Sequence, residues 1–424
     1  MKRTLPLSGL FSLALLVGCS AGNGNAGNPG GGGEAGTAGS PAVGGAGGQG
    51  GAGQGASTSD GGLFEVGGGG PGQGGGAPGE CISDANEDKD QDGFSVNAGD
   101  CNDCDPNVSP GSVEVKNTEP DMNGMIPEAA DEDCNGMVDD VVESCDMGLA
   151  LDSTDAFDGA KAIDLCQVAT PADKKWGVIE AAYVRANGSN ATPPNPLQYG
   201  LLDNFGPNVN VQRGAKMLGV SSGHARIPGQ AGACGSLTCY SNQDGTPPPA
   251  GFPQDVVNCS GSTNINDDVA LQLKIRSPKN ATGYKFNFKF YSFEYPEWVC
   301  TSFNDQYISL VDPPPMGSIN GNVSFDKQNN PVSVNVAFFD VCPGCALGDA
   351  ELAGNGYDTW DDAGGTGWLQ TQAPVTGGDE LTIRFAIWDT GDAAWDSTAL
   401  VDNFQWIANG GTVAVGTEPI PDPK

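Results

Sequence analysis

The 424-residue chain has little positive charge and almost no histidine. It carries 19 lysine and arginine residues against 53 aspartate and glutamate residues, and His224 is its one histidine. Because binding to nucleic-acid phosphates needs clustered basic side chains, no nucleic-acid partner is expected. A catalytic triad would have to use His224, and no Gly-x-Ser-x-Gly motif accompanies it. The Ser222-Gly223-His224 segment is therefore interpreted as a loop.

Long apolar runs are missing except near the start of the chain. The apolar stretch within residues 1–18 follows a positively charged start and is too short to span a bilayer. It ends in Leu16-Val17-Gly18-Cys19, which resembles a lipobox. The pattern predicts a lipoprotein signal peptide with a lipid on Cys19, and Ser20 favours the outer membrane of a Gram-negative bacterium. The alternative is an ordinary secretory signal with a chance cysteine.

Side chains able to form a core are absent after Cys19. Residues 19–80 are mostly glycine, with small and polar residues between. Such a segment cannot offset the entropy lost on ordering, so it is predicted to be a disordered tether. Residues 417–424 are predicted to be a disordered tail.

Cysteines number 13, and setting Cys19 aside leaves an even number. In an exported protein this indicates disulfides. Neighbours in sequence are expected to pair: Cys145 with Cys166, Cys234 with Cys239, Cys259 with Cys300, and Cys342 with Cys345. Four others are expected to pair among themselves in an order left open: Cys81, Cys101, Cys104 and Cys134. A redox-active Cys342-Pro-Gly-Cys345 motif is the alternative, disfavoured because no thioredoxin-like βαβ pattern surrounds it.

Acidic residues crowd into residues 81–142 with the spacing of calcium loops. Asp88, Asp90 and Asp92 stand at alternate positions and are followed by Gly93 and Phe94. Alternate carboxylates converge on one ion, the glycine permits a sharp turn, and the next residue donates a backbone carbonyl. An EF-hand would close with glutamate at position 12, which here is Gly99, so later acids must close the loop. The available ligands are Asp100, Asp103 and Asp105, and a second loop repeats the pattern with Asp131, Asp133, Asn135 and Asp139.

Together with Pro110-Gly111-x-x-Glu114, these motifs resemble a metal-binding repeat of bacterial surface proteins. They are also similar in style to thrombospondin type 3 calcium repeats. The resemblance implies a small, loop-rich spacer held by calcium and disulfides, although residues 117–127 depart from the family pattern. Copper is disfavoured because carboxylates suit calcium and copper prefers imidazole or sulfur. The alternative is a solvated acidic linker.

The rest of the chain divides into a connector and a large β domain. In the connector, residues 143–176, the Ser153-Thr154-Asp155 segment predicts the cap of a short helix over residues 156–165. In residues 177–416, apolar and polar side chains alternate with period two and no long amphipathic helix is visible. The apolar series include Val269 to Ile275, Tyr284 to Phe290, Val332 to Val336 and Leu381 to Ile387. This pattern predicts a mainly β fold, a β-sandwich of jelly-roll type.

One stretch of the β domain resembles a known family. The run Glu294-Tyr-Pro-Glu297, Cys300 and Phe303-Asn304-Asp305 after an aromatic strand resembles the choice-of-anchor L domain. A later run from Ala386 to Ala399 is similar to the closing strand of that domain. The resemblance covers most of residues 200–407. It implies a bacterial surface β domain that is joined to varied anchors, here the lipid on Cys19.

Several polar and aromatic side chains of the β domain are candidates for binding. A second calcium or ligand site is expected from Glu294, Glu297, Asn304, Asp305, Asp389, Asp392 and Asp396, the alternative being solvated loop acids. Glu294 and Glu297 also suggest a glycosidase pair, but residues three apart on a strand point to opposite faces. Sugar stacking on Trp298, Trp360, Trp368 or Trp395 is a further possibility, with core packing as the alternative.

These observations predict a non-enzymatic, lipid-anchored protein of the cell surface. Calcium is the expected cofactor, and the β-sandwich is expected to mediate adhesion or to bind a glycan, matrix or surface-protein ligand. The first alternative is an extracellular polymer hydrolase that uses Glu or Asp carboxylates. The second is a purely structural envelope protein.

Overall fold

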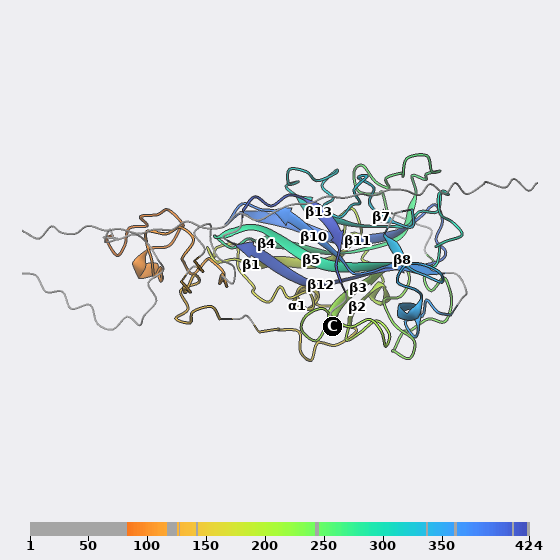
Figure 1. Cartoon of the computed structure of the whole chain (residues 1–424), viewed down its shortest axis with the longest axis horizontal. Helices are drawn as coiled ribbons and strands as arrows, with labels where there is room; N and C mark the ends of the chain where they lie inside the picture. Colours follow the sequence, from red (N-terminus) through yellow and green to blue (C-terminus); the bar gives the residue numbers. More distant parts are fainter. Residues whose placement is uncertain are drawn as a thin grey trace, which may run out of the picture. The chain divides into compact units, whose positions relative to one another are not determined.

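A computed structural model describes residues 83–116, 125–126, 128–140, 143–241, 246–335, 338–359, 363–408 and 411–421 (Figure 1). The chain divides into two units, Met1–Gly67 and Gly68–Lys424, and every described residue belongs to the second. The predicted signal peptide, lipidated Cys19 and tether therefore lie outside the described residues, as do Cys81 and Trp360. Within the described part of the chain, every helix is too short or too polar to cross a membrane.

Two antiparallel sheets form the body of the protein. The first has the strand order β1 (Gly177–Val184), β4 (Ile265–Arg276), β11 (Glu380–Thr390), β6 (Gln306–Asp312) and β7 (Val332–Ser333). The second has the order β13 (Gly416–Pro419), β10 (Leu369–Pro374), β5 (Ala281–Ser292), β12 (Ser397–Ala408), β3 (Met217–Ser221) and β2 (Tyr199–Leu202). β9 (Gly364–Thr366) pairs with both β5 and β8 (Phe339–Val341). The predicted mainly β, sandwich-like fold is confirmed. The disordered tail predicted over residues 417–424 is wrong in its first part, because residues 417–419 belong to β13 and pair with β10.

The core between the sheets is built from the alternating series seen in the sequence. Phe286 and Phe288 of β5 are fully buried and belong to the same cluster as residues of β4 and β11. The ring of Phe286 meets the ring of Phe385 on β11 edge-on at 5.1 Å, and Phe288 lies 5.0 Å from Tyr307 on β6. Because these contacts join strands of different sheets, the period-two pattern fixes which faces of the two sheets meet.

The outer faces of the sheets are buried as well, which the sequence pattern did not predict. Lys289, on the polar side of β5, is fully buried, forms an ion pair with Glu351, and places its ammonium group 5.5 Å from the centre of the Trp368 ring. A second apolar cluster that includes Phe205 and Tyr357 covers this face, and a third that includes Trp388 covers the other sheet. Long loops therefore wrap both sheets.

The connector contains a shorter helix than the sequence predicted. Helix α1 spans Ala156–Lys161, and the Asp155 side chain accepts a hydrogen bond from the Phe157 backbone N–H at 2.9 Å. The cap is thus the expected one. The chain then leaves the helical path, because the backbone N–H of Leu165 donates to the carbonyl of Ala160, and Asp164 has a left-handed φ of 72°.

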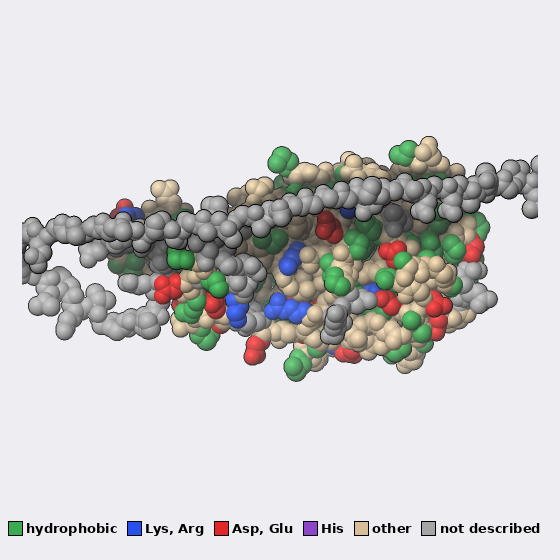
Figure 2. Space-filling model, viewed as in Figure 1, with side chains coloured by type: hydrophobic (Ala, Val, Ile, Leu, Met, Phe, Trp, Pro, Cys, Tyr) green, Lys and Arg blue, Asp and Glu red, His purple; other side chains and the backbone are tan. Residues whose placement is uncertain are grey.

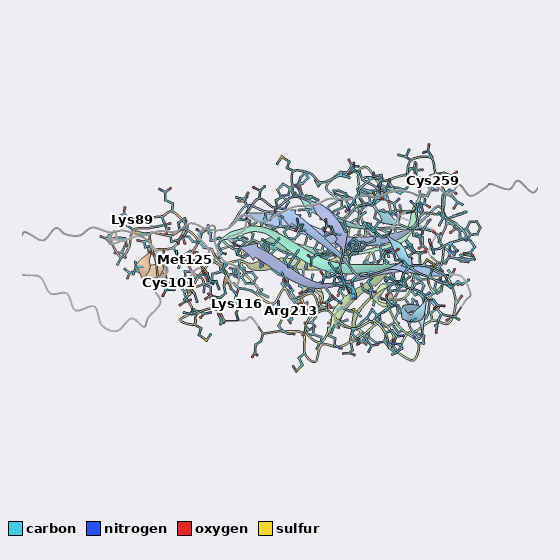
Figure 3. The ribbon with its side chains drawn as sticks, in the orientation of Figure 1. Lys89, Cys101, Lys116, Met125, Arg213 and Cys259 are labelled. Carbon is cyan, nitrogen blue, oxygen red and sulfur yellow. A yellow bond between two sulfur atoms is a disulfide. The ribbon has the colours of Figure 1, made fainter. Side chains whose placement is uncertain are left out.

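Disulfides join the four pairs expected from sequence proximity: Cys145–Cys166, Cys234–Cys239, Cys259–Cys300 and Cys342–Cys345. In the acidic module, defined as residues 83–140, Cys101 bonds Cys134, and Cys104 is also disulfide-bonded. Figure 3 labels Cys101 in this module and Cys259 in the loop before β4. Covalent links therefore hold the long loops where few apolar contacts are available.

The acidic module packs against the turn between β4 and β5. The backbone N–H of Val113 donates to the side-chain oxygen of Asn280 at 3.0 Å, and the Asn280 amide donates back to the Val113 carbonyl at 2.7 Å. The Trp176 indole donates to the Ser112 carbonyl at 3.1 Å. A Cβ at Gly111 would lie 2.8 Å from the ring of Phe94, so only glycine permits this close approach.

Candidate metal sites and a buried carboxylate cluster

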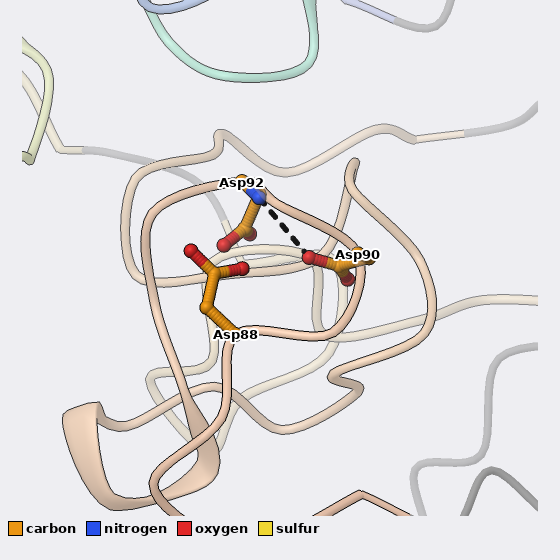
Figure 4. Close-up of side chains that lie close together, drawn as sticks. All are labelled: Asp88, Asp90 and Asp92. Atoms are coloured by element: carbon orange, nitrogen blue, oxygen red, sulfur yellow. Dashed lines mark hydrogen bonds between the residues drawn. The ribbon is translucent and has the colours of Figure 1, made fainter.

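The first acidic loop folds around its own carboxylates. Asp88 accepts the backbone N–H of Gly93 at 2.9 Å, Asp90 accepts that of Asp92 at 3.1 Å, and Asp92 accepts that of Phe94 at 2.8 Å. These bonds turn the loop inward, so that the three side chains come together (Figure 4). Gly93 has a φ of 106°, which side-chain-bearing residues rarely adopt and which makes glycine necessary at this position.

Each carboxylate of this loop keeps one oxygen free for a ligand. Asp88, Asp90, Asp92, Asp100 and Asp103 each have a buried carboxylate oxygen without a hydrogen-bond partner. Asp92, Asp100 and Asp103 are at most 4% exposed. Burying an unpaired carboxylate oxygen is costly unless a cation or a proton compensates it. The carboxylate oxygens of this loop can therefore bind a hard cation, and their burial is unfavourable without one.

Two of the three expected closing residues join the loop. Oxygens of Asp90, Asp100 and Asp103 lie within 4.8 Å of one another, as do those of Asp88, Asp90 and Asp92. Asp103 also accepts the backbone N–H of Lys89 at 3.1 Å, which ties the two segments together. Asp105 instead accepts the backbone N–H of Asn107 at 3.1 Å and lies in neither group. The loop is thus closed by Asp100 and Asp103, as the missing EF-hand glutamate required.

The second loop gathers a partly different set of ligands from the one proposed. Both oxygens of Asp131 accept backbone N–H groups within the loop. The side-chain oxygen of Asn135 accepts the backbone N–H of Met137 at 2.8 Å. The convergent groups are Glu114 with Glu132 and Asp139, and Glu114 with Asp133 and Asp140. Glu114 and Asp139 each have a buried oxygen without a partner. Sequence spacing missed Glu114 as a ligand because it lies in another segment, although the Pro110-Gly111-x-x-Glu114 motif contained it.

Burial and mutual repulsion disfavour the charged forms of these acids when no cation is present. Desolvation raises the pKa of Asp100 to about 6, and the neighbouring charges of Asp92 and Asp90 add to the effect. Desolvation also raises the pKa of Glu114 to about 7, reinforced by Asp133 and Glu132. A divalent cation would relieve this repulsion.

A second group of acids lies inside the sandwich. We define the interior carboxylate cluster as Asp267, Glu294, Asp305, Asp389 and Asp396, all at most 3% exposed. They sit where β4, β6 and β12 begin and where β5 and β11 end, because the strands are antiparallel and these ends meet. The structure thus brings together four of the seven acids and amides proposed for a second site and adds Asp267.

The other three proposed residues are not members of the buried cluster, although desolvation and the nearby charge of Asp392 both raise the pKa of Glu294 and Asp305. Glu297 is exposed on the turn after β5, while Glu294 is 2% exposed, so the two do not form a facing pair. Asn304 accepts the backbone N–H of Asn335 at 3.1 Å and thereby fixes a loop. Asp392 is exposed and accepts the backbone N–H of Ala394 at 3.2 Å.

Polar contacts in the interior carboxylate cluster are few. Asp305 accepts the Thr390 backbone N–H at 2.9 Å and the Ser397 hydroxyl at 2.6 Å. Desolvation raises the pKa of Asp305 to about 7 and that of Asp396 to about 8, and it raises the pKa of Glu294 and Asp389 well above the usual range. Without a cation, several of these acids are therefore protonated at neutral pH.

This ionisation predicts a pH dependence for metal-free protein. The pKa values of Asp305 and Asp396, about 7 and about 8 in the fold, exceed the unfolded values of about 4, so their stabilisation is complete below pH 4 and is lost as the pH rises through 7 and 8. Over the pH range in which the fold holds a proton that the unfolded chain has lost, each such acid lowers the free energy of unfolding by about 1.4 kcal/mol per pH unit, or Tm by roughly 3–6 °C per pH unit. Thermal melts in chelator between pH 6 and pH 9 test this. Asp305→Asn should flatten the profile, and a Tm that rises with pH would contradict the assignment.

An open groove and three aromatic side chains lie at the same end of the sandwich. The groove has a volume of about 610 Å³ and is lined by polar residues that include Thr246, Asn264 and Asp392. Trp298 packs edge-on against Phe303 at 5.1 Å and against Trp395 at 5.6 Å, and both tryptophans are half-buried. Trp368, by contrast, is 2% exposed and belongs to the core. On the face shown in Figure 2, exposed hydrophobic side chains are scattered singly.

Comparison with known proteins gives one family. Residues 179–403 match the model of the choice-of-anchor L domain. A search of curated proteins finds no match. The matched range begins within β1, ends within β12 and contains the whole interior carboxylate cluster, whereas the acidic module precedes it and β13 follows it. The family and the disulfides indicate an extracellular or surface protein.

Proposed function

Since the chain belongs to the choice-of-anchor L domain family, we propose that it is a lipid-anchored surface protein that binds calcium and presents its β-sandwich to a glycan ligand. Cys19 carries the lipid, and residues 21–79 act as the tether. The acidic module is a calcium-stiffened spacer between this tether and the sandwich. The outer membrane is the proposed location.

The unpartnered carboxylate oxygens of the acidic module are the observation that supports calcium binding. Five buried oxygens from Asp88, Asp90, Asp92, Asp100 and Asp103 have no hydrogen-bond partner, and they fall into two groups that share Asp90. All are hard oxygen ligands, which suit calcium, and calcium accepts six to eight such ligands in flexible geometry. Backbone carbonyls, among them that of Phe94, and water would complete the coordination.

The groove and the adjacent aromatic residues support a glycan ligand. Hydroxyl, amide and carboxyl groups line the groove, and these can pair with sugar hydroxyls. Trp298 and Trp395 are half-buried on loops, so their rings are positioned by packing yet remain reachable. Aromatic residues fixed in this way make strong contacts at low entropic cost. Protein and matrix-polymer ligands are the other occupants that a binding screen would reveal.

We propose that the sandwich is not an enzyme. A glycosidase needs two carboxyl groups that flank one bond in a site the substrate can enter. Glu297 is exposed while Glu294 is buried, and the interior carboxylate cluster is closed to a polymer. Hydrolysis of a polysaccharide that is lost in Glu297→Gln, with the fold intact, would instead establish the hydrolase alternative.

Trp298→Ala is expected to weaken glycan binding at least ten-fold without unfolding the protein. The substitution removes the ring that lies between Phe303 and Trp395, and ten-fold corresponds to about 1.4 kcal/mol. The full-length protein would be screened on a glycan panel in calcium, and the best hit titrated by calorimetry. Met147→Ala, which removes an 84% exposed side chain outside the groove, is the control. Equal affinity for both variants, or no hit on any glycan, would refute glycan binding.

A further inference from the structure

The interior carboxylate cluster contains buried oxygens that accept no hydrogen bond in the described structure. Neither carboxyl oxygen of Asp389 has a hydrogen-bond partner, and Oδ1 of Asp396 has none either. Asp389 is fully buried and Asp396 is 3% exposed. The Asp389 carboxyl does lie within side-chain hydrogen-bonding reach of the Ser222 hydroxyl and of the Asp305 carboxyl. The Ser222 hydroxyl, however, donates to the Ser397 carbonyl at 3.3 Å, and two carboxylates can pair only through a shared proton or a cation. Buried groups of this kind normally have partners, so these oxygens indicate a missing one.

No basic side chain supplies that partner within the described residues. The ion pairs found there involve other acids, and none reaches Glu294, Asp305, Asp389 or Asp396. Asp268, next to Asp267 in sequence, illustrates the contrast because Arg185 lies 3.5 Å from it. Because no lysine or arginine forms an ion pair with those four carboxyl groups, their charge is left for a cation of another kind to compensate.

Space for such a partner lies beside Asp396. A cavity of about 40 Å³ is lined by Asp396 together with Ser221, Tyr357 and Thr398, and His224 and Arg226 line it as well. It does not reach Asp389 or Asp305. This volume exceeds the roughly 30 Å³ that one water molecule occupies in the liquid. Gly223 lies directly against Asp396, since a Cβ there would lie 1.8 Å from Oδ2 of Asp396.

We propose that Asp389 and Asp396, with Asp305, bind a divalent cation of the calcium type between the two sheets, at a site separate from the acidic module. All donors are oxygens, which favour calcium or magnesium over transition metals. Unlike the module, the cluster does not place three carboxylate oxygens within 4.8 Å of one another in the described structure. Binding therefore requires the side chains to rotate toward the ion, and calcium tolerates the resulting irregular geometry better than magnesium.

The position of this site connects it to the ligand-binding end of the sandwich. Asp389 lies at the end of β11, Asp396 directly precedes β12, and Asp305 directly precedes β6. The loops between these strands carry Trp298 and Trp395. A cation that binds all three acids would therefore order the loops that hold the aromatic rings, whether or not their ligand is a glycan.

Ion counting on matched variants tests this site separately from the module. Full-length, oxidised protein would be titrated with calcium alone by calorimetry, and bound metal counted after dialysis. Asp389→Asn should bind one ion fewer per chain than the wild type. Asp92→Asn, in the acidic module, should lose module ions but keep the interior one. An Asp389→Asn protein that is folded and binds as many ions as the wild type overturns the proposal.

Terbium luminescence gives a second readout. The hydroxyl of Tyr357 donates to the Asp396 carbonyl at 3.4 Å, so an excited Tyr357 ring would sensitise terbium in the interior site. Emission should persist in Asp92→Asn and fall several-fold in Asp389→Asn. If Asp389→Asn does not fold, a variant with both Asp92→Asn and Asp133→Asn decides the question. One remaining ion and sensitised emission support the interior site, and the absence of both refutes it.

Discussion

Chelation of calcium is expected to make the acidic module, residues 83–140, sensitive to protease while the β-sandwich stays folded. The module buries few large apolar side chains, chiefly Phe94 and Val108, and the sandwich holds three apolar clusters of its own. Without a cation, the carboxylates of Asp88, Asp90 and Asp92 repel one another and leave their inner oxygens unpaired. Small domains without a core depend on metals and disulfides for their order.

Limited proteolysis with and without chelator, followed by mass spectrometry, measures this effect. Cleavage within the module should accelerate at least ten-fold in chelator, and the Cys101–Cys134 bond should keep the fragments together until reduction. Asp92→Asn should be cleaved in calcium as the wild type is in chelator. Asp84→Asn is the matched control, because Asp84 is exposed and belongs to neither of the two groups of convergent carboxylates in its loop. Identical cleavage with and without chelator would reduce the module to a solvated acidic linker.

Gly223→Ala is expected to destabilise the sandwich strongly, although it adds only one methyl group. The new Cβ would lie 1.8 Å from Oδ2 and 2.2 Å from Cγ of Asp396. Asp396 cannot move aside easily, because Oδ2 accepts the backbone N–H of Cys239 at 2.7 Å. Overpacking of this kind costs about 1–3 kcal/mol or more, which lowers Tm by roughly 2–12 °C in a domain of this size.

Thermal denaturation in calcium, monitored by circular dichroism, compares the variant with Gly235→Ala. Gly235 lies in the neighbouring disulfide loop, and a Cβ there meets nothing within 4 Å, so its substitution should change Tm little. Gly223→Ala should also weaken calcium binding at the interior site because it displaces Asp396. Equal melting temperatures for the two variants would show that the Ser222-Gly223-His224 loop is free to shift and does not hold Asp396 in place.

The sequence already contained a signal for the interior carboxylate cluster. Asp267 precedes Val269 by two residues, Asp389 follows Ile387 by two, and Glu294 follows Phe290 by four. Each acid thus continues a core-facing apolar series with period two. The sequence indicates Asp389 as a candidate ligand but not Asp267, because the residues around Asp267 have the alternating pattern of an ordinary strand. A β-bulge between Ile387 and Asp389, and a left-handed φ of 50° at Asp267, set the final directions of these side chains.

The sequence by itself determined the features that depend on local spacing. Period-two alternation predicted the mainly β sandwich, cysteine proximity predicted four disulfides, and alternate carboxylates with Gly93 predicted the first metal-ready loop. These patterns are readable because neighbouring residues impose their geometry on one another. Tertiary structure alone decided which distant segments meet. It brought Glu114 to the second loop and left Asp105 outside the first. It also buried Lys289 in an ion pair with Glu351, and it placed Glu294 in the interior but Glu297 at the surface. Antiparallel pairing gathers the ends of five strands at one place, and no local pattern specifies the partners across a sheet.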